Sequence, residues 1–105
     1  MDDLKKILPE LKAALERRYG ERLVKLILFG SYARGEATED SDIDVLAVVD
    51  SLDNKSRELF EVSDVAADIS FENDTLINLV LSSAEDYRSR NTALLMNVRR
   101  EGVEV

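Results

Sequence analysis

Cysteine and histidine are both absent from this chain of 105 residues. Without thiols or imidazoles the protein has no disulfide, no metal centre with cysteine or histidine ligands, no Ser–His triad and no histidine general base. Any chemistry must therefore be carried out by carboxylates, hydroxyls, amides and basic groups.

Long apolar runs are missing as well. None approaches the roughly 20 residues that a membrane-spanning helix needs. The N-terminal residues Met1, Asp2 and Asp3 also lack the basic region that opens a secretory signal. We therefore expect a cytoplasmic protein that does not interact with membranes.

Positive charge is scarce, because 14 Lys and Arg residues face 22 Asp and Glu residues and the net charge is −8. Such a chain has no surplus of cations to release counterions from a phosphate backbone, which argues against general nucleic-acid binding. Acidic residues concentrate between residues 36 and 86. Most acidic side chains only solvate a surface, so only those with an informative spacing are candidate metal ligands.

The length supports one domain that spans residues 1–105. Apolar residues between Leu4 and Leu15 recur at helical spacing, and Gly20 stands where a glycine would end that helix. Pro9 predicts a kink or a restart near the beginning of the helix.

Short runs of branched apolar residues predict three strands, at residues 23–29, 43–49 and 76–81. Residues 55–70 show helical spacing, and a last helix is predicted from Ser82 to about Arg100, with Gly102 closing it. Ser82 and Glu85 have the spacing of a capping box. This order of elements indicates an α/β fold in which helices cover a sheet of three to four strands.

Two aspartates open the second predicted strand, Asp42 and Asp44. Alternate strand residues point to the same face, so their carboxylates converge. Two such charges repel each other, and a divalent cation removes that penalty. Oxygen ligands select a hard ion such as Mg²⁺, which keeps several waters and binds substrate phosphates. The pair therefore predicts a site for magnesium and a nucleoside triphosphate.

Gly30 and Ser31 directly follow the first predicted strand. A glycine lets the backbone approach a phosphate closely, while free N–H groups and a serine hydroxyl can donate to its oxygens. Arg34 could add a charge-assisted contact, and Ser41 is a further nucleotide-binding candidate. Each residue also has a simpler interpretation, since Arg34 could be a surface ion-pair partner and Ser41 a cap or turn residue.

The pattern Gly30-Ser31, ten intervening residues and then Asp42-x-Asp44 resembles the signature of the nucleotidyltransferase superfamily related to DNA polymerase beta. The flanking residues, from Leu28 onward, are more closely similar to the minimal nucleotidyltransferases. These MNT proteins include antitoxins that are paired with HEPN-domain toxins. The resemblance extends from about Leu4 to the end of the chain.

This resemblance implies a nucleotidyltransferase fold, with a small mixed β-sheet flanked by helices. It also implies that Asp42 and Asp44 are catalytic and hold Mg²⁺, in a site that could take two metal ions, while Gly30 and Ser31 grip the triphosphate. The implied reaction transfers a nucleoside monophosphate, AMP from ATP in the first instance, to a hydroxyl and releases pyrophosphate. The implied acceptor is a HEPN-domain toxin or another partner protein.

A third carboxylate normally completes such a site, and here the sequence departs from the pattern. The aligned position in the third predicted strand is Asn78, whose amide is neutral and a very poor base. Asp74 could substitute if the strand starts early, Asp68 only if its segment were a strand, and Glu72 from a loop. It is also possible that no third carboxylate exists.

Two functions therefore remain open. The first is a magnesium-dependent protein nucleotidyltransferase that acts as the antitoxin of a toxin–antitoxin pair. The second is a catalytically weak or inactive module that neutralises a partner by binding, or senses nucleotide, without chemistry.

Overall fold

Four strands form one mixed sheet in the order β3-β2-β1-β4. The computed structural model describes residues 2–105, with side chains from residue 4 onward. β1 (Leu23–Phe29) pairs antiparallel with both β2 (Ile43–Val49) and the short β4 (Val103–Glu104), whereas β3 (Ile77–Ser83) runs parallel to β2. The small mixed sheet that the sequence implied is thus confirmed.

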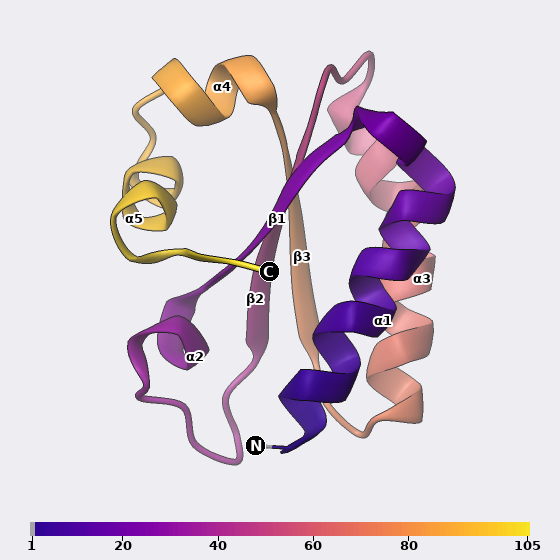
Figure 1. The fold of residues 1–105 in the computed structure, drawn as a ribbon, viewed down its shortest axis with the longest axis vertical. Helices are drawn as coiled ribbons and strands as arrows, with labels where there is room; N and C mark the ends of the chain where they lie inside the picture. Colours follow the sequence, from indigo (N-terminus) through magenta and orange to yellow (C-terminus); the bar gives the residue numbers. More distant parts are fainter. Residues whose placement is uncertain (1) are drawn as a thin grey trace.

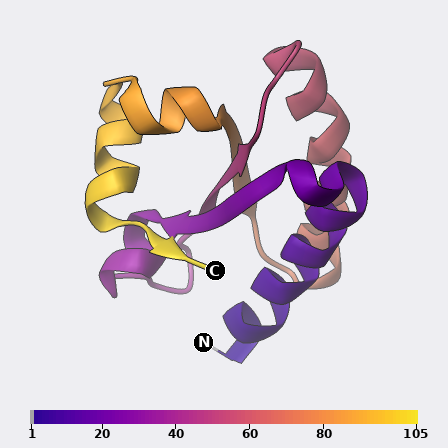
Figure 2. The ribbon, with the colours of Figure 1, turned by 45° about the horizontal axis from the view of Figure 1, so that its top comes forward.

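Helices cover both faces of this sheet (Figure 1). α1 (Asp2–Tyr19) and α3 (Lys55–Glu72) lie side by side on one face, and α4 (Ala84–Ser89) and α5 (Ala93–Glu101) lie on the other, as Figure 2 also shows. The short α2 (Gly30–Arg34) continues directly from β1. It therefore lies at the end of the sheet where β2 and β3 begin.

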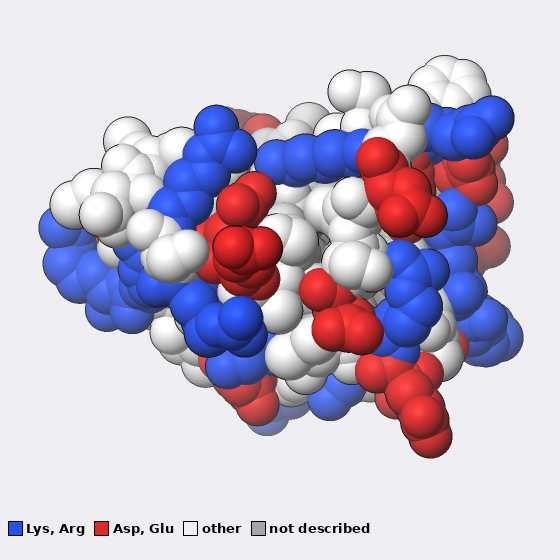
Figure 3. Space-filling view, turned by 90° about the horizontal axis from the view of Figure 1, so that it is seen from above, with Lys and Arg blue, Asp and Glu red and all other residues white. Residues whose placement is uncertain are grey.

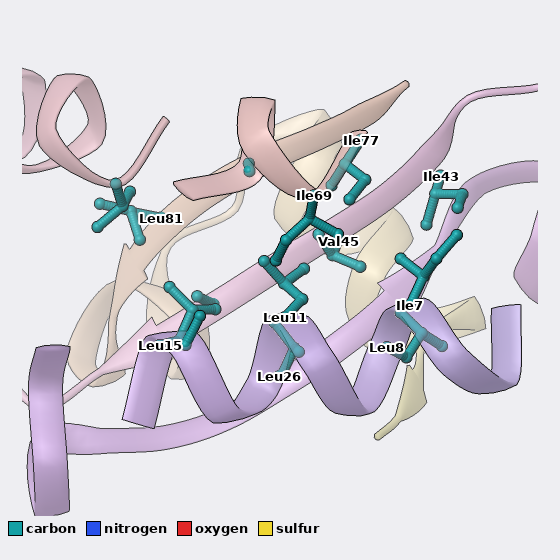
Figure 4. Packing of buried hydrophobic residues seen from close by; sticks show 14 of the residues in the cluster. Ile7, Leu8, Leu11, Leu15, Leu26, Ile43, Val45, Ile69, Ile77 and Leu81 are labelled. Atoms are coloured by element: carbon teal, nitrogen blue, oxygen red, sulfur yellow. The ribbon is translucent and has the colours of Figure 1, made fainter. Parts of the chain in front are cut away.

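Alternate strand residues divide between two hydrophobic cores. On β2, Val45 and its alternate neighbours pack against α1 and α3, while Leu46 and Val48 pack against α5. Figure 4 shows Leu11 and Leu15 of α1 directed toward the sheet and α3. Fully burying a side chain of this size contributes roughly 1.5–3 kcal/mol, so these two cores account for most of what holds the layers together.

The C-terminal end of the first helix lies where the sequence predicts it, whereas the region around Pro9 differs from the prediction. α1 ends at Tyr19, and Gly20 begins a 3₁₀ turn (Gly20–Arg22) that leads into β1, so the predicted stop is confirmed. Pro9 lies inside one continuous α1, so the helix does not restart there. The exposed position of Pro9 lets water solvate the carbonyl that its missing N–H leaves without a partner.

The single last helix that the sequence predicted is two helices. α4 begins after Ser83, whose hydroxyl accepts the N–H of Asp86 at 3.1 Å, so the predicted cap at Ser82 was wrong by one position. Ser82 is still part of β3 and is buried. A second cap follows at Thr92, whose hydroxyl accepts the N–H of Leu95 at 3.1 Å and starts α5.

Arg99 fixes the link between these two helices. Its guanidinium donates to the carbonyl oxygens of Tyr87 at 2.7 Å and Arg90 at 3.0 Å, and to Oδ1 of Asn91 at 2.8 Å. A side chain from α5 thus satisfies carbonyls at the end of α4, and α5 lies across the sheet face rather than continuing α4.

Opposite charges are interspersed over much of the surface. On the face that Figure 3 shows, basic and acidic side chains lie next to one another. Such charges also form ion pairs, among them Arg18–Glu61 at 2.6 Å and Arg90–Asp86 at 3.6 Å. Within residues 2–105, no helix is both long enough and apolar enough to cross a membrane.

A buried serine joins the end of α3 to the start of β3. Ser70 donates its hydroxyl to the carbonyl of Ala66 at 2.7 Å and accepts the N–H of Ile77 at 3.1 Å. Replacing Ser70 by Ala would leave the N–H of Ile77 buried without this partner, and we expect a loss of about 1–3 kcal/mol in the free energy of unfolding.

Urea denaturation measures this loss. Ser63→Ala is the matched control, because the exposed hydroxyl of Ser63, on the same helix, donates only to the carbonyl of Phe60. Equal stability losses in the two variants would show that the Ser70 bridge has no special importance.

Candidate functional site

The site begins where β1 ends. Phe29 is the N-cap residue of α2 and has extended backbone angles, and Gly30 then turns the chain with φ at +74°. Sequence analysis missed this helix, because five residues are too few to show a helical period. The backbone N–H groups of a first helical turn have no partner within the helix, so they can donate to an anion that binds at the start of the helix.

Gly30 lies against the carboxylate of Asp44. The antiparallel register sets Phe29 opposite Asp44, which brings the next residue beside that side chain. A Cβ at position 30 would overlap Oδ2 of Asp44. Glycine is therefore required here for two reasons, its positive φ and the space that the aspartate fills.

Asp42 and Asp44 do converge, as the sequence predicted, and Asn78 lies between them. In the parallel register of β2 and β3, Asn78 is the direct partner of Asp44. Its amide Nδ2 donates to Oδ2 of Asp42 at 3.2 Å and to Oδ1 of Asp44 at 3.0 Å. One neutral amide thus bridges the two carboxylates, and its donated hydrogen bonds offset part of their mutual repulsion.

This donor set fits a hard divalent cation. Two carboxylates supply anionic oxygens, and turning the Asn78 amide over would present its oxygen to the same point. Among the side chains that the structure describes, no three acidic, histidine or cysteine residues form a group able to hold a metal. The two carboxylates and the amide would therefore leave the remaining ligands of a cation to water and phosphate.

The three acids that the sequence offered as substitutes lie elsewhere. Asp68 is on the exposed side of α3, as its helical spacing indicated, and lines a cavity with Arg17. Glu72 is the exposed last residue of α3. Asp74 follows in the turn with φ at +50° and lines a separate cavity of about 470 Å³ with Glu39. None of them joins the Asp42 and Asp44 pair in a group of three.

Arg34 and Ser41 make contacts that are ordinary for surface residues, namely ion pairs for Arg34 and a hydrogen bond within a turn for Ser41. The Arg34 guanidinium pairs with Glu36 at 3.2 Å and with Glu101 of α5 at 3.0 Å. Ser41 accepts the N–H of Thr38 at 2.9 Å and so closes the turn before Asp42. Both side chains lie on the segment between β1 and β2 that carries the candidate site.

A groove of about 860 Å³ runs from this site along β3, and sequence analysis did not predict it. Asp44 and Asn78 line one part of it, and the rest is mainly apolar, with Phe71 and Leu76 among its walls. Phe71 is 90% exposed and Leu76 is 54% exposed. An apolar residue beside a predicted core helix or strand is normally assigned to the core, so the sequence carried no signal for this surface.

The tight contact at Gly30 generates a prediction for Gly30→Ala. We expect this change to cost more than about 2 kcal/mol of stability, because it combines positive-φ strain with displacement of the Asp44 carboxylate. Gly20→Ala is the matched control, since φ is +59° there and nothing lies within 4 Å of the added Cβ. Urea denaturation compares the two, and equal losses would contradict the contact.

Comparisons with known proteins show to which family the chain is similar. The family model described as a nucleotidyltransferase domain matches residues 8–93. MJ0604 of Methanocaldococcus jannaschii, which carries the provisional name of a protein adenylyltransferase, is 37% identical over 98 residues, covering 92% of each chain.

Solved structures agree as well. A crystal structure of a toxin–antitoxin with AMP-PNP matches 90% of this chain and 68% of that chain, at 28% identity and a TM-score of 0.63. A protein described provisionally as a minimal nucleotidyltransferase matches 97% of this chain and 95% of that chain, at 27% identity and a TM-score of 0.61. The chain therefore belongs to the nucleotidyltransferase domain family.

Proposed function

We propose that this nucleotidyltransferase transfers AMP from ATP to a hydroxyl of a partner protein, and that Asp42 and Asp44 are its catalytic residues. The observation that carries the proposal is the convergence of these two carboxylates beside Gly30, at the start of α2. This convergence supports the proposal, because carboxylate oxygens that would bind a cation lie next to backbone N–H groups that would donate to a phosphate.

Each part of the site has a role in this reaction. Asp42 and Asp44 would hold Mg²⁺, which neutralises charge on the triphosphate when bound. Gly30 leaves room for the Asp44 carboxylate beside the first N–H groups of α2, which would donate to a phosphate, and the Ser31 hydroxyl is a further donor. The acceptor oxygen attacks the α-phosphorus and its proton passes to water, the bond to the bridging oxygen breaks in line with the attack, and pyrophosphate leaves.

Arg34 and Ser41 complete the proposed nucleotide-binding set. To reach a phosphate, Arg34 must leave Glu36 and Glu101. Exposed ion pairs of this kind contribute only about 0–1 kcal/mol, so a triphosphate can compete for the guanidinium. Ser41 holds the turn that delivers Asp42, and its hydroxyl keeps a proton to donate.

A toxin is the proposed acceptor. The similar solved structure is a toxin–antitoxin with AMP-PNP, and the provisional name of MJ0604 is that of a protein adenylyltransferase. The motif resemblance points to the HEPN class of toxins. This assignment makes the chain an antitoxin that acts in the cytoplasm, where ATP is available.

Intact-mass spectrometry tests the activity. The chain is incubated with ATP, Mg²⁺ and the HEPN-domain protein expressed with it, and the partner should gain the mass of one or more AMP groups. Chelation of the metal by EDTA should abolish this gain. An unmodified partner in the presence of folded, nucleotide-binding protein would overturn the proposal.

The double change Asp42→Asn and Asp44→Asn tests the two carboxylates. It keeps their size and removes both charges, so we expect the initial rate of AMP transfer to fall by about 100-fold or more. Asp40→Asn is the matched control, because Asp40 is exposed in the same turn and does not join the pair in a metal-binding group. A double variant that keeps wild-type transfer would exclude the proposed metal site.

A second function has its own observation in its favour. Asn78 pairs with Asp44 at the position where the motif resemblance implies a third carboxylate, and its amide cannot accept the proton of an attacking hydroxyl. A module that binds nucleotide and neutralises its partner without chemistry would need no such base. If the Asp42 and Asp44 double variant still neutralises the toxin in growth assays, binding is sufficient.

Asn78→Asp distinguishes the two functions. We expect a carboxylate at this position to raise the rate of AMP transfer by about tenfold or more, because it adds a general base and a charged ligand. It should also lower the melting temperature in EDTA, since the bridging hydrogen bonds are lost and a third negative charge is added, and Mg²⁺ should restore the melting temperature.

The control for this change is Asn97→Asp, which adds the same charge to an exposed position of α5. A transfer rate that stays undetectable in Asn78→Asp, with nucleotide binding intact, would favour the module without chemistry.

A further inference from the structure

β3 has a free edge. It is the outermost strand of the sheet, with β2 on one side and no strand on the other among residues 2–105. The N–H of Ile43 donates to the carbonyl of Leu76 at 2.9 Å, which fixes the phase of the parallel ladder. Asn78 and Val80 therefore direct their backbone groups to β2.

The intervening residues of β3 direct their backbone groups outward. Ile77 confirms this phase, because its N–H bonds to the Ser70 hydroxyl rather than to β2. For Leu79, both the N–H and the carbonyl point to the open edge. An exposed strand edge of this kind is a ready template for another extended segment.

The groove of about 860 Å³ follows this edge, and Asp44 is the single charged residue among its lining residues. Because 34% of the residues in the chain are charged, a groove with a single charged lining residue is unusually poor in charge. Phe71 and Leu76, the most exposed apolar side chains of its wall, would be covered by an apolar occupant.

We infer that this groove is the docking site for an extended, mainly uncharged segment of the acceptor protein, which adds to the free edge of β3. The inference rests on the proposed function and names the surface through which the acceptor reaches the site. Side chains of an added strand alternate between two faces. Those on one face would lie toward Phe71 and α3, and those on the other toward Asp44 and Asn78, where a hydroxyl can meet the carboxylates.

The charge of the chain argues against a second copy as the occupant. Two copies would each bring a net charge of −8 to the contact. Pairing of β3 with β3 would also cover Asp44 and Asn78 in both copies and exclude any acceptor. An uncharged segment of a partner avoids both problems.

Phe71→Glu tests the docking site against a closely matched control. Phe71 lines the groove, whereas Phe60, on the same helix, is also 75% exposed but lies outside it. The measurement is the Kd for the HEPN-domain protein, by calorimetry in the presence of Mg²⁺ and AMP-PNP. We expect Phe71→Glu to weaken binding by about 10- to 100-fold and Phe60→Glu to change it less than about twofold.

Two further readouts separate this inference from the proposed function. Affinity for Mg²⁺ and AMP-PNP alone should be the same in both variants, because neither phenylalanine belongs to the catalytic site. If wild-type protein binds the partner but transfers no AMP, the proposed function fails, and the groove is still judged by the difference between the two variants.

Amide hydrogen exchange, followed by NMR, tests the strand addition itself. Partner binding should slow exchange of the Leu79 N–H by at least about tenfold, while the Val80 N–H, already bonded to β2, serves as the internal reference. Equal effects of Phe71→Glu and Phe60→Glu, unchanged exchange at Leu79, or no binding of the HEPN-domain protein to wild type would overturn the inference. So would a dimer of this chain that dissociates in Phe71→Glu, because a second copy would then be the occupant.

Discussion

The central constraint in this structure is the repulsion between two carboxylates that the sheet forces together. Asp44 is fixed between Phe29 on β1 and Asn78 on β3, and Asp42 approaches from the turn before the strand. Without a cation, the Asn78 amide offsets part of that repulsion through hydrogen bonds of 3.0 and 3.2 Å. The glycine at position 30, the start of α2 and the approach of β3 are all arranged around this pair.

Much of the fold was predictable because burial leaves a periodic trace in the sequence. The three long strands and the two long helices follow from apolar spacing, and their observed bounds differ from the expected ones by few residues. The break between α4 and α5 was not predictable in this way, since Tyr87 of α4 lies seven positions before Leu94 of α5 and the apolar positions keep a helical period across the break. The cap was misplaced because Ser82 and Ser83 each precede an acid by three residues, and only burial of Ser82 distinguishes them.

The neighbours in the candidate site were predictable from the sequence, whereas their contacts were not. Spacing brought Asp42 and Asp44 to one face and Gly30 to the end of the preceding strand, and the family resemblance pointed to Asn78. Neither could reveal that Arg34 pairs with Glu101, 67 positions away, since such contacts depend on the packing of α5. The open edge of β3 could not be predicted either, because the order of strands depends on the whole sheet and not on any one segment.

An asparagine between two aspartates affects the metal-free and metal-bound states in opposite directions. In the metal-free state it donates to both carboxylates, which a third aspartate could not do, so the pair stays assembled. In the proposed metal-bound state it would offer one neutral oxygen where an aspartate would offer a charged ligand and a base. In the proposed reaction, nucleotide would then still bind together with a cation, while proton removal from the acceptor would be slower. The triphosphate would supply the charge that the protein lacks, so we expect cation binding and nucleotide binding to be strongly coupled at this site.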